Sequence, residues 1–288
     1  MAAKILNLVA GGSLLASGMA CSSCFGDELR YPSSRICNRC EGRKVLACSE
    51  WMPAVREIDG QTAICAIGDV HGCADLLQEM HAGIAHEFDL ISPRAAYCIH
   101  LGDLIDRGPE SLRALSLAMQ GIPGATNCTL IGNHEDRLLQ LLRAPDAKMM
   151  DRWLANGGAE FFEELSVDPR DGWEGRVSEL LGGHTIEWLH SLPLKLQLGD
   201  LLFVHAGIDV EVPIDRQTAE TLAWIREPWL SSNGPYENNL AVIHGHTPIA
   251  DVVLGNQHRI NLDTGACETG VLSALLIHGS RMKLLQTR

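Results

Sequence analysis

Five short polar motifs follow one another along this 288-residue chain, and each contains residue types that bind metals. They are Gly68-Asp69-Val70-His71-Gly72, Gly102-Asp103-Leu104-Ile105-Asp106-Arg107-Gly108, Gly132-Asn133-His134-Glu135, Phe203-Val204-His205-Ala206-Gly207 and Gly245-His246-Thr247-Pro248. Together they supply carboxylate, amide and imidazole groups, the mixed oxygen and nitrogen set that holds a pair of divalent metals for phosphate ester hydrolysis. A single Asp-x-His is usually an ordinary loop feature, so it is the series of motifs that predicts a metal site.

Short apolar runs must position these motifs. Five of them lead directly into a motif and a sixth comes later: residues 63–67, 97–101, 129–131, 201–204, 240–243 and 271–277. Leu77, Met80 and Ile84 have the spacing of a helix with one buried face, Pro109 suits the first turn of a second helix, and Asp215 is a candidate cap for a later one. The alternation predicts a layered α/β core in which loops at strand ends aim polar side chains at one point.

Composition limits the classes of function. The chain is 46% apolar, yet no apolar run reaches the roughly 18 residues of a membrane span. Its formal net charge of -13 lacks the basic stripe that nucleic-acid binding needs, whereas metals at a local site can still attract an anionic substrate. We therefore expect a globular protein with no nucleic-acid partner and no membrane span.

Residues 1–60 differ in character from the rest, and we place a domain boundary near Gly60, with residues 61–288 as the main domain. The pairs Cys21-Ser22-Ser23-Cys24 and Cys37-Asn38-Arg39-Cys40 have the gap that lets two sulfurs reach one zinc ion. A structural zinc knuckle and unpaired thiols in a leader both stay open as interpretations. The remaining cysteines are scattered singly, which favours a reducing cytoplasm. Residues 5–20 read either as an ordinary helix or tail, or as a signal peptide cleaved at Cys21.

At its motifs the chain resembles the metal-dependent serine/threonine phosphoprotein phosphatases of the bacterial and phage type, within the calcineurin-like metallophosphoesterases. The resemblance runs from about Ile64 nearly to the C-terminus. It includes Asn156-Gly157-Gly158-Ala159-Glu160, Trp224-Ile225-Arg226-Glu227 and Asn261-Leu262-Asp263-Thr264-Gly265. It implies an α/β sandwich of two β-sheets flanked by helices, with two divalent metals at the sheet edge.

The resemblance also implies a role for individual residues. Asp69 and His71 would hold one metal, and Asp103 would bridge it to a second metal held by three further side chains, Asn133, His205 and His246. A hydroxide between the metals would attack the phosphorus in line, and manganese is the expected metal, although iron or zinc accepts the same ligands.

Other motif residues would act on the substrate. His134 would be the general acid, oriented by Asp106, while Arg107 and Arg226 would bind phosphoryl oxygens. Asp263 either orients a ligand or closes a turn with Gly265. Two histidines beside the ligand loops, His100 and His244, are expected to be core or supporting residues, and His81 is expected to be ordinary.

Two other functions compete with a phosphoprotein phosphatase. Symmetrical dinucleoside tetraphosphate hydrolases share residues 68–73 and Arg107-Gly108-Pro109, but they typically have Asp where this chain has Glu135. A noncatalytic scaffold whose zinc knuckle binds a partner is disfavoured because all six metal ligands are present. The expected substrate is a phosphoprotein or a small phosphoester.

Overall fold

The computed structural model describes residues 46–170 and 172–287. Cys21, Cys24, Cys37 and Cys40, for which we considered a zinc site, lie outside these residues, as does the apolar segment 5–20. Among the described helices, none is both long and apolar enough to cross a membrane.

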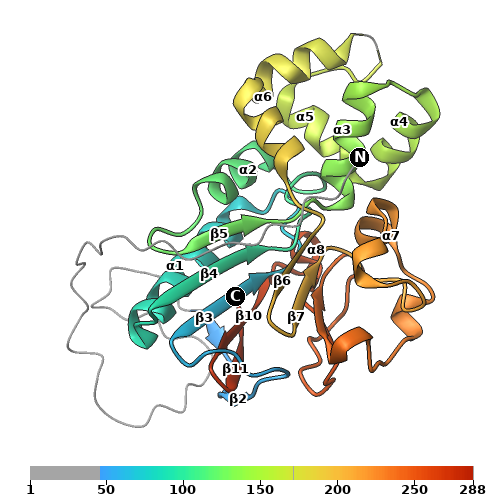
Figure 1. Ribbon diagram of the computed structural model, residues 1–288. Helices are drawn as coiled ribbons and strands as arrows, with labels where there is room; N and C mark the ends of the chain where they lie inside the picture. Colours follow the sequence, from blue (N-terminus) through green and yellow to red (C-terminus); the bar gives the residue numbers. More distant parts are fainter. Residues whose placement is uncertain (1–45, 171, 288) are drawn as a thin grey trace, which may run out of the picture.

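Two β-sheets pack face to face, which confirms the predicted α/β sandwich (Figure 1). The larger sheet has seven strands, and its β3, β4 and β5 are parallel. In the smaller sheet β7, β8 and β9 are parallel, and β6 is antiparallel to β7. The strands of the larger sheet are β1 (Ala47–Cys48), β2 (Met52–Pro53), β3 (Thr62–Ile67), β4 (Ala95–His100), β5 (Thr126–Thr129), β10 (Ser273–His278) and β11 (Arg281–Gln286), and those of the smaller are β6 (Lys195–Leu198), β7 (Leu201–Val204), β8 (Ala241–His244) and β9 (Arg259–Asn261).

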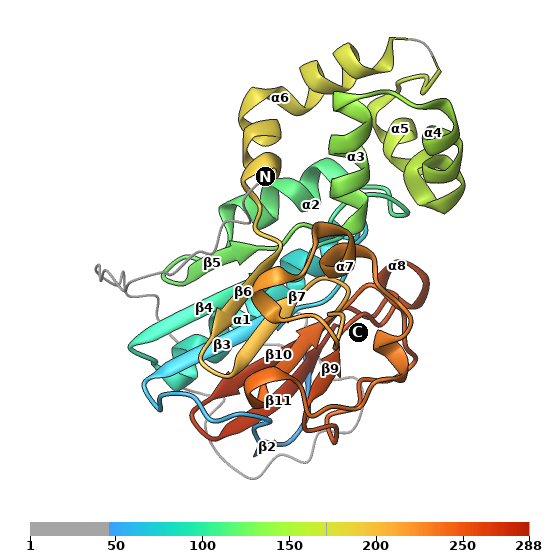
Figure 2. The same cartoon turned by 45° about the vertical axis from the view of Figure 1, so that its right-hand side comes forward.

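Helices cover the outer face of the larger sheet and one end of its strands (Figures 1 and 2). Helix α1 packs on β3, while α3 to α6 form a separate helical group beyond the strand ends. The helices are α1 (Ala74–Ile91), α2 (Ser111–Gln120), α3 (Asn133–Arg143), α4 (Ala147–Trp153), α5 (Ala159–Leu165), α6 (Trp173–Ser191), α7 (Ala219–Trp224) and α8 (Ala266–Thr269), with a π-helical turn at Leu154–Gly158 and 3-10 turns at Ile214–Arg216, Trp229–Ser231 and Glu237–Asn239.

Strand β3 shows why the central strands have unbroken apolar sequences. Because side chains alternate along a strand, Cys65 and Ile67 join the cluster beneath the helices, whereas Ile64 and Ala66 join the cluster between the two sheets. A strand buried on both faces needs apolar residues at every position.

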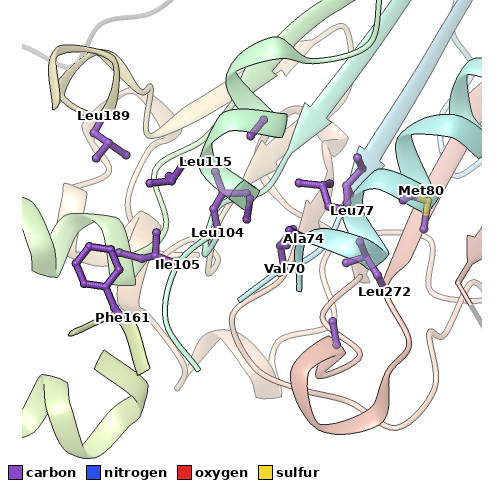
Figure 3. Packing of buried hydrophobic residues seen from close by; sticks show 14 of the residues in the cluster. Val70, Ala74, Leu77, Met80, Leu104, Ile105, Leu115, Phe161, Leu189 and Leu272 are labelled. Carbon is purple, nitrogen blue, oxygen red and sulfur yellow. The ribbon is translucent and has the colours of Figure 1, made fainter. Parts of the chain in front are cut away.

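The same buried packing extends into the motif loops. Leu104 and Ile105 of the second motif belong to the cluster beneath the helices, together with Val70 of the first motif (Figure 3). Apolar anchors of this kind fix the loops that carry the polar side chains.

Two predicted local features differ from the structure. The third of the predicted strands, residues 129–131, corresponds to β5, which spans Thr126–Thr129. It ends earlier than predicted because the N–H of Ile131 points away from the sheet and donates to the carbonyl of Pro193. Helix α7 is capped by Thr218, which accepts from the N–H of Thr221, whereas Asp215 lies in a separate 3-10 turn.

The packed fold begins before Gly60, the boundary expected from the sequence. Strands β1 and β2 both pair with β11, and Leu46 and Val55 are buried in the two core clusters. Strands of two residues are too short to leave a hydrophobic period in the sequence, so the pairing of β1 and β2 could not be expected from it.

We therefore expect a chain that begins at Gly60 to be less stable than one that begins at residue 45. The shorter chain loses β1 and β2 and the burial of Leu46 and Val55, each worth about 1.5–3 kcal/mol. Urea unfolding of the two chains measures the difference. Equal midpoints with equal slopes would show that these residues pack without contributing to stability.

Candidate metal centre

The six predicted metal ligands meet where the strands of both sheets end. Their exposed fractions lie between 0% and 5%, and they come from all five motifs: Asp69, His71, Asp103, Asn133, His205 and His246. The loops after β3, β4, β7 and β8 carry five of them, and Asn133 opens helix α3. Parallel strands end at a common edge, so loops far apart in the sequence converge there.

Asp103 lies at the middle of the group. One of its carboxylate oxygens is 3.5 Å from Nε2 of His71, and the other is 3.4 Å from Nε2 of His205. The side-chain oxygen of Asn133 is 3.0 Å from Nε2 of His205 and 2.7 Å from Nδ1 of His246. Asp103 thus lies between the imidazoles of His71 and His205, with one carboxylate oxygen facing each ring.

Backbone carbonyls orient two of the imidazoles. Nδ1 of His71 is 3.0 Å from the carbonyl of Ile105, and Nδ1 of His205 is 2.9 Å from that of Leu101. With an N–H at Nδ1, each ring turns its Nε2 toward Asp103. Burial alone would lower the pKa of His205, but Asp103 outweighs it and raises the pKa to about 10, so a metal ion would have to displace the Nε2 proton of that ring. The first and fifth motifs are joined as well, because the N–H of His246 donates to the Asp69 carboxylate at 3.0 Å.

Several site residues have a strained backbone. His71, Asp103, Asp106, Arg107 and His246 have φ between 45° and 74°, the left-handed region. For residues with a Cβ this conformation costs on the order of 1 kcal/mol each. Such strain persists only where the surrounding contacts enforce it, and it clusters at functional sites.

Glycines in the motifs allow the loops to approach one another. A Cβ on Gly245 would collide with the Asp69 carboxylate, and a Cβ on Gly108 would collide with the carbonyl of His71. A side chain at either position would push the ligand loops apart.

Cations fit the electrostatics of this group. Burial, and then repulsion from the neighbouring Asp263, raise the pKa of Asp69 well above its usual value, and a bound cation would favour the ionised carboxylate instead. Burial lowers the pKa of His71 and of His246 to about 3, which keeps both rings neutral, as metal ligation requires.

At this site, two groups of donor side chains could each hold a metal ion. They are His71, Asp103 and His134 in one group, and Asp103, His205 and His246 in the other, with the donor atoms of each group within 4.8 Å of one another. The Nε2 atoms of His71 and His246 are buried without a hydrogen-bond partner, as expected of nitrogens that bind a metal ion.

His134 and Asp106 form a buried pair beside Asp103. Nδ1 of His134 is 2.5 Å from the Asp106 carboxylate, which also accepts a hydrogen bond from the indole N–H of Trp153. Nε2 of His134 lies 3.9 Å from Asp103. Burial alone would lower the pKa of His134, but Asp103 and Asp106 outweigh it and raise the pKa, so the protonated ring is favoured.

The two predicted phosphate-binding arginines are placed differently. Arg107 is half-buried and 3.3 Å from His134, and its backbone N–H donates to the carbonyl of Gly157 at the π-helical turn before α5. Arg226 is exposed, and after burial its charge is among the factors that lower the pKa of His246. The structure therefore brings Arg107 into contact with the site and places Arg226 at its rim.

Glu135 has a structural role that the sequence analysis did not identify. Its carboxylate accepts four backbone N–H groups, from Asp103, Leu104, Ile105 and Gly132, at 2.7 to 3.2 Å. It thereby joins the second and third motifs. The only sequence signal was the position of an acid three residues after Gly132, which suits a capping box at the start of α3.

Asp263 is buried and closes a turn, because one of its carboxylate oxygens accepts the N–H of Gly265 at 2.9 Å. The other oxygen is buried without a hydrogen-bond partner, and burial raises the pKa of Asp263 to about 6. The turn was one of the two roles considered from the sequence, and the free oxygen leaves the second role open to experiment.

The fold and this constellation define a metal-dependent phosphoesterase. The sequence pattern of the calcineurin-like phosphoesterase family matches residues 62–268, and the chain belongs to that family. It is thus a hydrolase of the metallophosphoesterase superfamily.

The relatives divide between two kinds of substrate. Serine/threonine-protein phosphatase 2 of Escherichia coli is 40% identical, with 73% of this chain and 90% of that protein covered. An asymmetrical bis(5'-nucleosyl)-tetraphosphatase of Oceanobacillus iheyensis is 24% identical, with 72% and 86% covered. The crystal structure of a putative diadenosine tetraphosphatase superposes with a TM-score of 0.58 at 19% identity, covering 82% of this chain and 98% of that one, and it supports the fold.

The contacts of Glu135 predict the effect of Glu135→Gln. Each carboxylate oxygen accepts two of the four N–H groups, so an NH₂ group in place of either oxygen leaves two buried backbone N–H groups facing a second donor. We expect a loss of about 2–5 kcal/mol in the free energy of unfolding, together with weaker metal binding. Urea unfolding and metal titration measure the two effects.

Glu163→Gln, at an exposed position on α5, is the control and should change stability by less than about 0.5 kcal/mol. Equal stability of the two variants would contradict the role of Glu135.

Proposed function

We propose that this protein is a phosphomonoester hydrolase of the serine/threonine protein phosphatase type. The observation that carries the proposal is the buried His134–Asp106 pair next to Asp103. Such a pair can protonate a poor leaving group, and the alkoxide of serine or threonine is one.

Asp69, His71 and Asp103 would hold one divalent metal, and Asp103 would share the second with Asn133, His205 and His246. Carboxylate, amide and imidazole ligands suit manganese, the metal we expect, and they also accept iron or zinc. Bound metals would supply Lewis-acid stabilisation of the phosphoryl group and an activated water. The burial of all six side chains, and the strain in their loops, support this use over a noncatalytic scaffold.

The chain's own residues would position and protonate the substrate. Arg107 presents a planar pair of N–H donors that suits two phosphoryl oxygens, and its contact with Gly157 fixes its backbone. Arg226 would contact the same group from the rim. His134 would give its Nε2 proton to the departing oxygen while Asp106 stabilises the ring, and Trp153 would hold Asp106 in place.

A dinucleoside tetraphosphate hydrolase is the alternative, and the tetraphosphatase relatives favour it. Its leaving group is a nucleoside phosphate of low pKa, which departs with little help from a general acid. The 40% identity to a serine/threonine phosphatase favours the phosphomonoesterase. Hydrolysis of a phosphoserine peptide, a phosphotyrosine peptide and a dinucleoside tetraphosphate, compared side by side with manganese, tests the proposal. A kcat/KM that is highest for the tetraphosphate would overturn it.

Asp103→Asn tests the shared metal ligand. Because one carboxylate is proposed to serve both cations, we expect metal content to fall and phosphatase activity to drop by at least about a thousandfold, while the fold is retained. Elemental analysis, kinetics and circular dichroism measure these outcomes. Activity at the original level in that variant, in the presence of a chelator, would exclude the binuclear mechanism.

His134→Asn separates proton transfer from metal chemistry. We expect phosphoserine hydrolysis to slow by about 10²–10⁴-fold, whereas nitrophenyl phosphate, with a good leaving group, should lose far less. The measurement is kcat on both substrates. His190→Asn, at an exposed position on α6, is the matched control. Equal losses on the two substrates would rule out His134 as the general acid.

A further inference from the structure

A second group of metal-binding side chains lies away from the candidate metal centre, between helix α1 and the larger sheet. His81 on α1 and two residues of β4, Cys98 and His100, place their donor atoms within 4.8 Å of one another. Cys98 and His100 have no exposed surface, and His81 is 9% exposed. Nε2 of His81 is 2.8 Å from Nε2 of His100. The sequence analysis assigned no metal to these residues.

Strand register adds a fourth donor to this layer. Cys98 and His100 are two residues apart on β4, so they point to the same face of the sheet. Cys65 on β3 pairs directly with Cys98, and both belong to the core cluster beneath the helices. Two thiols and two imidazoles from three elements thus share one buried layer, the donor set of a tetrahedral structural zinc site.

The charges of this set suit a site without water. Burial lowers the pKa of His81 to about 4 and of His100 to about 3, so both rings are neutral near pH 7. Two thiolates would balance the charge of one zinc ion, and a neutral cluster avoids most of the cost of burying an ion. Burial raises the pKa of Cys98 to about 12, so metal binding must displace the thiol proton.

The two histidines require only a small adjustment, whereas Cys65 lies outside the three-residue donor group and its side chain would have to turn toward the ion. Two nitrogens that bind one zinc at about 2.0–2.1 Å with a tetrahedral angle lie about 3.3 Å apart. The rings of His81 and His100, now joined by a hydrogen bond, must separate by about half an ångström to reach this distance. On its other side, Nδ1 of His100 is 3.1 Å from the hydroxyl of Thr129, the kind of contact that orients a metal-binding histidine.

We propose that His81, Cys98 and His100, with Cys65 as the fourth ligand, form a structural zinc site. Helix α1 follows the loop that carries His71, and β4 leads into the loop that carries Asp103. A zinc ion between them ties together the elements that hold the first and second motifs. The site therefore supports the catalytic loops without contacting the substrate.

Cobalt(II) provides the test, because cobalt bound to thiolate has an intense near-ultraviolet charge-transfer band that oxygen and nitrogen ligands do not produce. The background protein is the full-length chain with Cys21→Ser, Cys24→Ser, Cys37→Ser, Cys40→Ser and the exposed Cys48→Ser, so the N-terminal thiols cannot contribute. Titration of this protein with cobalt(II) is expected to give the thiolate band. Its absence would overturn the proposal.

Variants of the same background assign the band. Cys98→Ala is expected to abolish it, and Cys128→Ala, whose thiol packs on the cluster between the two sheets, is the matched control that retains it. An unchanged band in Cys98→Ala would overturn the proposal. If Cys98→Ala does not fold, His81→Gln on α1 tests the proposed site instead. For this variant we expect cobalt binding, measured from the same band, to be at least tenfold weaker, with an unchanged circular dichroism spectrum. Undiminished affinity in His81→Gln would also overturn the proposal.

Discussion

The gathering of carboxylates out of water is the constraint on which the rest of this structure depends. Asp69, Asp103 and Asp263 are all buried, and like charges at such depth repel strongly. Neighbouring histidines offset part of this repulsion. Burial would raise the pKa of Asp103, but His205 and His134 outweigh it and lower the pKa well below its usual value. Bound cations would replace the protons on these groups and would relieve the repulsion between the carboxylates.

Holding these groups together requires left-handed backbone conformations, which residues with a Cβ rarely adopt. Left-handed conformations at five site residues are stable only because the core beneath them is rigid. Leu104 and Ile105 anchor the second motif in that core, and the Glu135 carboxylate binds four N–H groups of the second and third motifs. The stability of the sandwich thus offsets the strain at its edge.

Much of this arrangement could be predicted from the sequence, because strands buried on both faces leave unbroken apolar runs and the motifs follow them directly. This pattern predicted that the polar motifs meet at one edge, whereas the choice of six side chains as candidate ligands came from the resemblance to a known family. Trp153 could not be predicted, since its hydrogen bond to Asp106 spans 47 residues and depends on how the helical group packs. Nor could β1 and β2, whose pairing with β11 leaves no periodic pattern. The contacts of Glu135 were hidden because an acid in the first turn of a helix usually only caps it.

The contact between Arg107 and Gly157 has a consequence for how such enzymes diverge. A Cβ at Gly157 would collide with the Arg107 side chain, and the turn that contains Gly157 joins α4 to α5 in the helical group beyond the sheets (Figure 2). Insertions in the α4–α5 connection can therefore move the guanidinium while five of the six candidate metal ligands stay on loops of the sandwich, the sixth being Asn133 at the start of α3. The position of the Arg107 side chain thus depends on a turn outside the two sheets, whereas the loops that carry five of the candidate metal ligands depend on the sheets themselves.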